Sequence, residues 1–314
     1  MTEATRILQT NLFDYYMKKL FILALTIALV SPAVFAQKGK NLFPPTDKDK
    51  LGMVSYTYRK SFAKDVGATL DTIKALGIVN MEFSNLFGRT AKDIKALLDE
   101  RGMKCTSFGV GYPDLENKID QVASNAKTLG AEFVRVAWVP HQGEFTLETA
   151  KKTVADFNKF GKTLKEQGLT FCYHNHGYEF QPVPAEVASE VKGGSEKTLF
   201  DYIVQKTDPQ YVSFEMDILW TFFPGQNPAE ILKRYPTRFK LMHVKDLRKG
   251  VEGNLSGGTP VENDVALGTG QLNLPEILKA ADKSSIRYYY IEDESPSITT
   301  QVPISIAFLR TLKK

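Results

Sequence analysis

The chain has 314 residues, of which 43% are hydrophobic and 24% charged, with 22 Gly, 15 Pro and 2 Cys. These fractions are close to the average of globular proteins and exclude a disordered chain, a collagen-like repeat and a disulfide scaffold. The 40 basic and 36 acidic residues give a formal charge of +4 and are mixed along the sequence. Nucleic-acid-binding proteins usually carry a basic stripe or an Arg-rich arm, so we expect no nucleic-acid partner.

The first 36 residues are expected to precede the folded domain. Lys18 and Lys19 are followed by the apolar run LFILALTIALV and by SPAVFA, which ends at Ala36. A short basic region, an apolar run and small residues before a cleavage point are typical of a secretory signal sequence, and residues 1–16 are then an upstream extension. An N-terminal membrane anchor is the alternative, but the run is short for a membrane span and Pro32 interrupts it.

We therefore predict a mature chain that begins near Gln37 and is exported, with a periplasmic location and no stable membrane insertion after processing. Residues 37–50 form its N-terminal segment, and residues 51–314 form the folded domain. Its two cysteines, Cys105 and Cys172, show no CxxC spacing and are expected to be small buried side chains, with a single disulfide as the alternative.

From residue 51 onward, short β-rich apolar runs alternate with segments of helical periodicity. The helical spacing is clear in AKDIKALLDERG (91–102) and in LETAKKTVADFNKFGKTLKEQG (147–168). Strands separated by amphipathic helices predict parallel strands joined by βαβ crossovers. The runs predicted as strands are LGMVSYT (51–57), IVNMEFS (78–84), MKCTSFGV (103–110), EFVRVAW (132–138), LTFCYHN (169–175), YVSFEMD (211–217), FKLMHVK (239–245) and RYYYIED (287–293).

Eight such units predict a single-domain α/β protein with a closed (β/α)8 TIM barrel. The alternative is an open doubly wound sheet, which usually has a Gly-rich phosphate loop after its first strand. Here the first strand is followed by YTYRKSF, so that motif is missing. Irregular insertions at 181–197 and 248–270 follow predicted strands, and we expect both to be βα loops on the catalytic face rather than linkers between domains.

Chemically reactive side chains gather at the carboxyl ends of the predicted strands, where barrel enzymes build their active sites. The four histidines of the chain, which all lie at or just beyond such ends, are His141, His174, His176 and His243. Each of these histidines taken alone is more often a structural or surface residue. All four on one face favour a functional site.

Glu179, Asp217, His243 and Glu292 come from four successive predicted strands. Burying an isolated carboxylate is costly, so such groups are normally paired, hydrogen-bonded or bound to a metal. Three oxygen donors and one imidazole suit one divalent ion, which can be Mn²⁺, Mg²⁺, Co²⁺ or Zn²⁺. A helix cap or a rim salt bridge is the ordinary explanation for each carboxylate alone.

An ordered set of motifs resembles the xylose isomerase-like TIM barrel family, which includes sugar isomerases, sugar epimerases, inosose dehydratases and the endonuclease IV type of DNA-repair enzyme. The resemblance covers roughly residues 51–312. The motifs that carry it are YHNHGYEF, FEMDILWTFFPGQNP, LMHVKDL, ALGTGQLNLPEIL and YYYIEDE.

The resemblance implies a divalent metal held by a Glu, an Asp, a His and a Glu from the last four strands. The last three correspond to Asp217, His243 and Glu292. The first is assigned to Glu179, with His174 or His176 as the alternatives, because this chain has YHNH where sugar epimerases usually have a glutamate within the strand.

Such a site predicts removal of a proton beside a carbonyl, with Glu292 and Glu179 as acid and base and His176 as a further proton carrier. The resulting enediolate leads to isomerisation, epimerisation or elimination. The residues expected to contact substrate are His174, Lys245, Trp138, Trp220 and Glu82. For Lys245 an interior ion pair is the alternative, and for the two tryptophans it is core packing.

We expect a metal-dependent sugar isomerase or epimerase. An exported lyase or hydratase of 3-keto glycosides and a non-catalytic sugar-binding barrel are the alternatives. Export favours a free sugar or an oxidised glycoside over a phosphorylated sugar. Four histidines are too few for the zinc cluster of the DNA-repair branch, and the resemblance allows a homo-oligomer.

Overall fold

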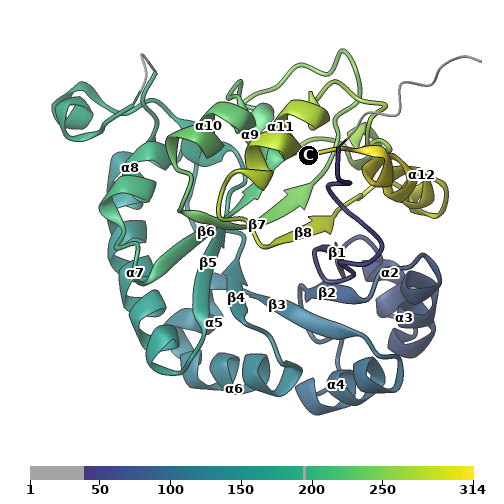
Figure 1. The fold of residues 1–314 in the computed structure, drawn as a ribbon. Helices are drawn as coiled ribbons and strands as arrows, with labels where there is room; N and C mark the ends of the chain where they lie inside the picture. The colour runs from purple at the N-terminus through teal and green to yellow at the C-terminus, as the bar shows by residue number, and fades with distance from the viewer. Residues whose placement is uncertain (1–38, 194–195) are drawn as a thin grey trace, which may run out of the picture. The chain divides into compact units, whose positions relative to one another are not determined.

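The computed structural model describes residues 39–193 and 196–314. Its eight strands are parallel and pair in chain order, and β8 pairs with β1 to close the barrel. Figure 1 shows the strands at the centre and the helices around them. The strands are β1 (Leu51–Val54), β2 (Asn80–Phe83), β3 (Lys104–Val110), β4 (Phe133–Val136), β5 (Thr170–His174), β6 (Val212–Asp217), β7 (Phe239–Val244) and β8 (Tyr288–Ile291). Each lies within one of the eight predicted runs, so the predicted (β/α)8 TIM barrel is confirmed.

Helices follow the strands and pack on the outside of the barrel. They are α2 (Arg59–Phe62), α3 (Val66–Ala75), α4 (Ala91–Glu100), α5 (Tyr112–Asn117), α6 (Ile119–Leu129), α7 (Leu147–Glu166), α8 (Leu199–Lys206), α9 (Ile218–Phe222), α10 (Pro228–Arg234), α11 (Leu274–Asp282) and α12 (Ile298–Thr311). Three short 3-10 turns complete the described structure: η1 (Tyr178–Phe180), η2 (Ala185–Glu190) and η3 (Val261–Asn263).

Local sequence signals set the helix ends. Thr90 begins α4 with a capping box, in which its hydroxyl accepts the backbone N–H of Asp93 and the Asp93 carboxylate accepts that of Thr90. After α7 the chain turns at Gly168, whose φ of +81° favours glycine. The predicted helices at 91–102 and 147–168 are therefore confirmed, each with its last two residues in the closing turn.

Strand residues alternate between the barrel interior and the helix layer. One apolar cluster of the interior consists of Val54, Phe133, Cys172, Leu241, Tyr288 and Tyr290. A Cβ atom at Gly52 would lie 2.7 Å from the Tyr290 ring, so glycine there leaves the room that the tyrosine fills. Toward the carboxyl ends of the strands, the interior positions are taken by buried polar residues instead.

Both cysteines are buried and free, as the sequence predicted, at Cys105 in β3 and Cys172 in β5. The N-terminal segment packs onto the barrel through Leu42, whose backbone N–H donates to the carbonyl of Leu312, and through Phe43, whose ring lies 5.1 Å from that of Tyr289. The predicted signal sequence falls within residues 1–38, outside the described residues.

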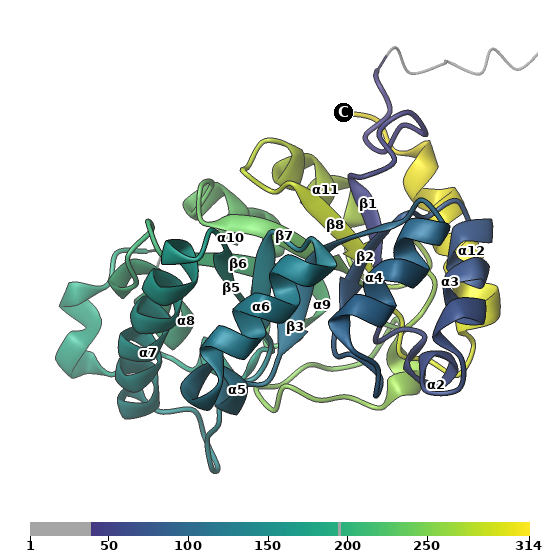
Figure 2. The ribbon, with the colours of Figure 1, turned by 90° about the horizontal axis from the view of Figure 1, so that it is seen from below.

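The long segment after β7 crosses one end of the barrel (Figure 2). Asp246 organises this segment, because its carboxylate accepts the backbone N–H groups of Leu247, Gly268, Gly270 and Leu272. The insertions at 181–197 and 248–270 follow β5 and β7, so they are βα connections as predicted. Within residues 39–193 and 196–314, no helix combines the length and the apolar character that crossing a membrane requires.

Candidate active site

A cavity of about 420 Å³ opens at the carboxyl ends of the strands. Three of the four histidines line it, together with two carboxylates and the rings of one tyrosine and one tryptophan. The lining residues are Tyr56, Ser84, Arg135, Ala137, His174, His176, Trp220, His243, Gly257, Gly258, Thr259, Glu292 and Glu294. A larger cavity of about 710 Å³, beside α9 and α10, has Glu276 as the one titratable side chain in its lining. The candidate active site is therefore the smaller cavity, where the histidines and carboxylates gather.

Asp217 ends β6 and begins α9. Its Oδ1 accepts the backbone N–H groups of Leu219 at 2.8 Å and Trp220 at 3.0 Å, so it caps the helix. The other oxygen, Oδ2, is buried and accepts no hydrogen bond within the described structure. Asn175, just after β5, connects that strand to the end of β6, because its amide oxygen accepts the Asp217 backbone N–H at 3.1 Å. The cap thus holds one oxygen of Asp217 and directs the other into the site.

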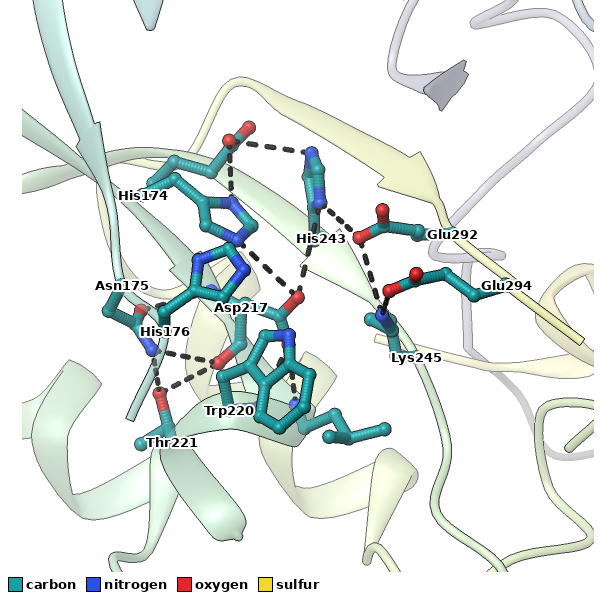
Figure 3. A network of polar contacts seen from close by, with 12 residues as sticks. His174, Asn175, His176, Asp217, Trp220, Thr221, His243, Lys245, Glu292 and Glu294 are labelled. Atoms are coloured by element: carbon teal, nitrogen blue, oxygen red, sulfur yellow. Dashed lines mark hydrogen bonds and ion pairs between the residues drawn. The ribbon is translucent and has the colours of Figure 1, made fainter. Parts of the chain in front are cut away.

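Two histidines face this free oxygen (Figure 3). Nε2 of His174 lies 3.7 Å from Oδ2 of Asp217, and Nδ1 of His243 lies 4.0 Å from it. Oε2 of Glu292 lies 2.7 Å from the same Nδ1 of His243. Four strands, β5 to β8, therefore deliver two imidazoles and two carboxylates to one point.

These residues fit a divalent cation. Ligand atoms of His174, Asp217 and His243 lie within 4.8 Å of one another, and all three side chains are buried. A buried carboxylate oxygen without a partner normally requires a hydrogen-bond donor or a cation. Burial raises the pKa of Asp217 to about 7, against the opposing charge of Lys245. Imidazole and carboxylate donors suit Zn²⁺, Co²⁺ or Mn²⁺.

Glu179, the ligand assigned from sequence, lies apart from this group. Gly177, with a φ of +97°, turns the chain back after β5. Oε1 of Glu179 then accepts hydrogen bonds from the Tyr173 hydroxyl at 2.8 Å and the His176 backbone N–H at 2.9 Å. Tyr173 alternates with His174 along β5 and packs against α7. His174, one of the two alternatives named from sequence, is the residue of β5 whose ligand atom lies close to those of Asp217 and His243.

The same contacts remove Glu179 from the predicted pair of proton-transfer groups, because its carboxylate does not line the cavity. Burial raises the pKa of Glu179 to about 7. Its role in the described structure is to shape the turn that carries His176.

His176 and Trp220 lie next to each other in the cavity lining. Their rings stack with centroids 5.7 Å apart and an interplanar angle of 20°. Nδ1 of His176 is buried without a hydrogen-bond partner in the described structure. Burial lowers the pKa of His176 to about 3, so its imidazole is neutral at pH 7. Trp220 is 5% exposed and lines the cavity as predicted.

The other predicted substrate contacts lie at different depths. Trp138 is 45% exposed, stacks on His141 at 5.2 Å and is not part of the cavity lining. Lys245 is buried beneath Trp220, with Nζ 5.5 Å from the indole ring. Glu82 lies deeper still and is fully buried. The structure therefore brings Trp220 to the cavity and leaves Trp138 at its rim.

Lys245 is surrounded by acidic groups. Its Nζ lies 2.8 Å from Glu294, 3.4 Å from Asp264 and 3.6 Å from Glu292. Burial opposes the charge on Glu292, but the Lys245 and His243 cations hold the pKa of that carboxyl below its usual range. Glu292 is therefore ionised at pH 7.

Sequence reasoning missed Arg135 and Glu215, which lie beneath the two histidines. Arg135 Nη2 is 2.6 Å from Oε1 of Glu82, and its Nε is 3.3 Å from Oε2 of Glu215. Strand periodicity could have identified Glu215, because it stands two positions before Asp217 and thus on the same face of β6. Arg135 likewise occupies an inward-facing position of β4, but the sequence does not indicate which residues it pairs with.

A family model for the xylose isomerase-like TIM barrel matches residues 70–312. The chain belongs to the xylose isomerase-like TIM barrel family.

One similar protein and two similar solved structures represent the proteins that this chain resembles. An inosose dehydratase of Clostridium perfringens is 22% identical over 305 residues, which cover 84% of this chain and 97% of that protein. The crystal structure of a sugar phosphate isomerase/epimerase from Parabacteroides distasonis superposes with a TM-score of 0.66 at 24% identity, covering 85% of this chain and 98% of that one. The IolI protein, whose crystal structure contains a zinc atom, superposes with a TM-score of 0.63 at 16% identity, covering 83% and 96%. The relatives are thus enzymes of both the dehydratase and the isomerase type.

Proposed function

We propose that this protein is a divalent-metal-dependent enzyme that removes the proton beside the carbonyl of an unphosphorylated sugar or oxidised glycoside. The reaction favoured is isomerisation or epimerisation. The observation that carries the proposal is the convergence of His174, His243 and the unpartnered Oδ2 of Asp217 at the base of a sugar-sized cavity.

His174, Asp217 and His243 would hold the ion, with Glu292 beside them. A bound divalent cation would polarise the substrate carbonyl and stabilise the negative charge that develops when the neighbouring proton leaves. The zinc atom in the IolI protein supports a metal in this fold.

Proton transfer is assigned to Glu292 and His176. Glu292 lines the cavity as an ionised carboxylate, and the neutral His176 presents Nδ1 without a competing partner. Two proton carriers that follow different strands can act on two positions of one substrate. Trp220 stacks on the His176 ring and would hold it in place.

Charge favours a neutral substrate over a phosphorylated one. Among the described residues that line the cavity, Arg135 is the one Lys or Arg, and it is already paired with Glu82 and Glu215. Lys245 is paired with three carboxylates. Because Glu292 and Glu294 also line the cavity, a phosphate group would meet negative charge without a free cation to bind. An exported protein, as we propose from residues 17–36, would also encounter free sugars.

Elimination is the second candidate. The inosose dehydratase relatives favour it, and the same residues would perform it if His176 returned its proton to a leaving hydroxyl or glycosidic oxygen. The two reactions share the first step and differ in the fate of the intermediate.

The test is proton exchange in D₂O. The purified protein, loaded with Zn²⁺, Co²⁺ or Mn²⁺, is incubated with free sugars, 3-keto glycosides and their phosphorylated counterparts, and ¹H NMR follows the proton beside the carbonyl. We expect metal-dependent exchange with the neutral compounds, and an Asp217→Ala/His243→Ala variant should lose it. A deuterated isomer indicates isomerisation or epimerisation, whereas loss of a substituent indicates elimination. Turnover of phosphorylated sugars alone would contradict the proposed substrate class.

If the loaded protein binds the sugars but exchanges no proton in any of them, it is a sugar-binding barrel and the proposed enzymatic function fails.

A further inference from the structure

A layer of charged side chains lies directly beneath the proposed metal site and has no part in the chemistry so far assigned. It consists of Glu82 in β2, Arg135 in β4 and Glu215 in β6, all buried. Oε1 of Glu82 lies 2.7 Å from Nε2 of His243, and Oε2 of Glu215 lies 3.0 Å from Nδ1 of His174. Each of the two histidines therefore has one nitrogen on this layer and the other toward Asp217.

We infer that Glu82 and Glu215, held together by Arg135, are positioning residues that determine which nitrogen of each histidine is available to a metal. Each accepts an N–H from one imidazole and thereby directs Nε2 of His174 and Nδ1 of His243 toward Asp217 as the nitrogens for a metal. The inference rests on the proposed metal site and goes beyond it.

The contacts of Glu215 fix the direction of its hydrogen bonds. Its Oε2 lies near three nitrogens, which are Nδ1 of His174, Nε of Arg135 at 3.3 Å and Nε2 of His243 at 3.4 Å. A guanidinium can only donate. Oε2 thus accepts from Arg135, and the nitrogen of His174 that faces it is placed to donate.

Glu82 is fully engaged as an acceptor. Its Oε2 accepts the Ser107 hydroxyl at 2.6 Å, and its Oε1 accepts Arg135 and Nε2 of His243. Nδ1 of His243 lies 4.0 Å from Asp217 and 2.7 Å from Glu292, so a metal ion there would replace the proton that Nδ1 shares with Glu292, while the Nε2 proton stays directed at Glu82.

The same atoms could be taken for a second cation site, since Glu82, Glu215 and His243 offer ligand atoms within 4.8 Å of one another. Arg135 argues against it. Its guanidinium already contacts both carboxylates, so a metal ion there would meet a fixed positive charge. Because the guanidinium of Arg135 bridges the two carboxylates, we interpret the layer as a support for the two histidines. Carboxylates behind metal-bound imidazoles orient the ring and raise its basicity, and their loss typically costs about 10- to 100-fold in metal affinity.

The first test reads the proton positions in the unaltered protein. With ¹⁵N in the imidazole rings, only four histidines contribute signals, and His141→Gln and His176→Gln variants separate them. In the Zn²⁺-loaded protein we expect the His174 proton on Nδ1 and the His243 proton on Nε2. A His174 proton on Nε2 would overturn the inference.

The same spectrum separates this inference from the proposed function. If the protein binds no Zn²⁺, the proposed function fails. Even then, a His174 proton on Nδ1 supports the inference that Glu215 orients this ring, and a proton on Nε2 contradicts that inference.

The second test measures metal affinity in variants. Glu215→Gln and Glu82→Gln should weaken Zn²⁺ binding by about 10- to 100-fold and alter the visible absorption of the Co²⁺-loaded protein. Asp201→Asn, which alters a buried carboxylate paired with Arg234 rather than with a histidine, is the matched control. Equal affinities and unchanged Co²⁺ spectra in all three variants would show that the layer does not position the ligands. Unfolding temperatures identify any variant that fails to fold, and for such a variant the proton positions in the unaltered protein decide.

Discussion

Nε2 of His174 lies 3.7 Å from Oδ2 of Asp217, an oxygen that accepts no hydrogen bond within the described structure. The strand register explains this approach. His174 pairs with Glu215 across β5 and β6, and Asp217 follows two positions later on the same face. A histidine and an aspartate on neighbouring strands thus face one point, which is the arrangement that a shared cation requires.

This relationship predicts that His174, and not Glu179, is the metal ligand from β5. His174→Ala should weaken Zn²⁺ binding by more than about 100-fold, because loss of a direct ligand exceeds the cost of losing a supporting carboxylate. Glu179→Gln should leave the affinity nearly unchanged, since its carboxylate bonds to Tyr173 and to the backbone of His176. Equilibrium dialysis followed by mass spectrometry of the metal measures both. The reverse order of effects would restore Glu179 to the site.

Glu179 should make stability depend on pH. Burial raises its pKa from 4.5 to about 7, so the native state holds a proton that the unfolded chain releases. Its contribution to stability is therefore fully present below pH 4.5 and is lost as the pH rises through 7. Glu179→Gln stays neutral, so relative to the wild type it should gain about 2–4 kcal/mol between pH 4.5 and 8. Urea unfolding at several pH values checks this, and a constant difference between the two proteins would refute it.

The two tryptophans should respond differently to truncation. Trp220 is 5% exposed and packs against His176 and Phe223, so Trp220→Ala should cost about 3–5 kcal/mol of stability. Trp138 is 45% exposed, so Trp138→Ala should cost about 1 kcal/mol or less. Urea unfolding gives both values, and a sugar-binding titration shows which ring contacts the ligand. We expect weaker binding from the Trp220 variant, and comparable losses of stability would contradict the burial difference.

The two cysteines should be unreactive in the folded protein. Burial raises the pKa of Cys105 to about 12 and that of Cys172 well above its ordinary value, so neither forms the thiolate that reacts with thiol reagents. A colourimetric thiol assay should detect no reaction in native protein and two thiols per chain after unfolding in urea. Rapid reaction of one thiol under native conditions would show that its strand opens.

Asp246 should hold the long segment after β7 in place. Its carboxylate accepts four backbone N–H groups, from Leu247, Gly268, Gly270 and Leu272. Asp246→Ala leaves them without this partner, which should cost about 3 kcal/mol or more. Limited proteolysis should then cut within residues 248–270 faster than in the wild type. Lys249→Ala, an exposed change in the same segment, is the control, and equal cutting rates in both variants would contradict this role.

Much of the site could be predicted from the sequence because of how a parallel barrel is built. Asp217, His243 and Glu292 each stand at the carboxyl end of a strand or just beyond it, and those ends meet at one face. Any sequence reading that recognised the strands would bring the three together. The layer of Arg135 and its two carboxylates was not predicted, because its members come from strands that are distant in the chain and their pairing depends on the closed interior.

The sequence by itself determined the eight-stranded barrel, because alternating apolar runs and helical segments leave parallel strands few other ways to bury their faces. It also determined which end of the barrel carries the reactive groups. Only the tertiary structure shows which of His174, His176 and Glu179 lies close to both Asp217 and His243. That choice depends on which side chains of β5 point inward and on the turn at Gly177, which carries the Glu179 carboxylate back to Tyr173. Periodic sequence patterns predict where the strands lie and which end of each carries a given residue. The contacts of a side chain beyond a turn depend on residues that are distant in the sequence and become its neighbours only in the folded chain.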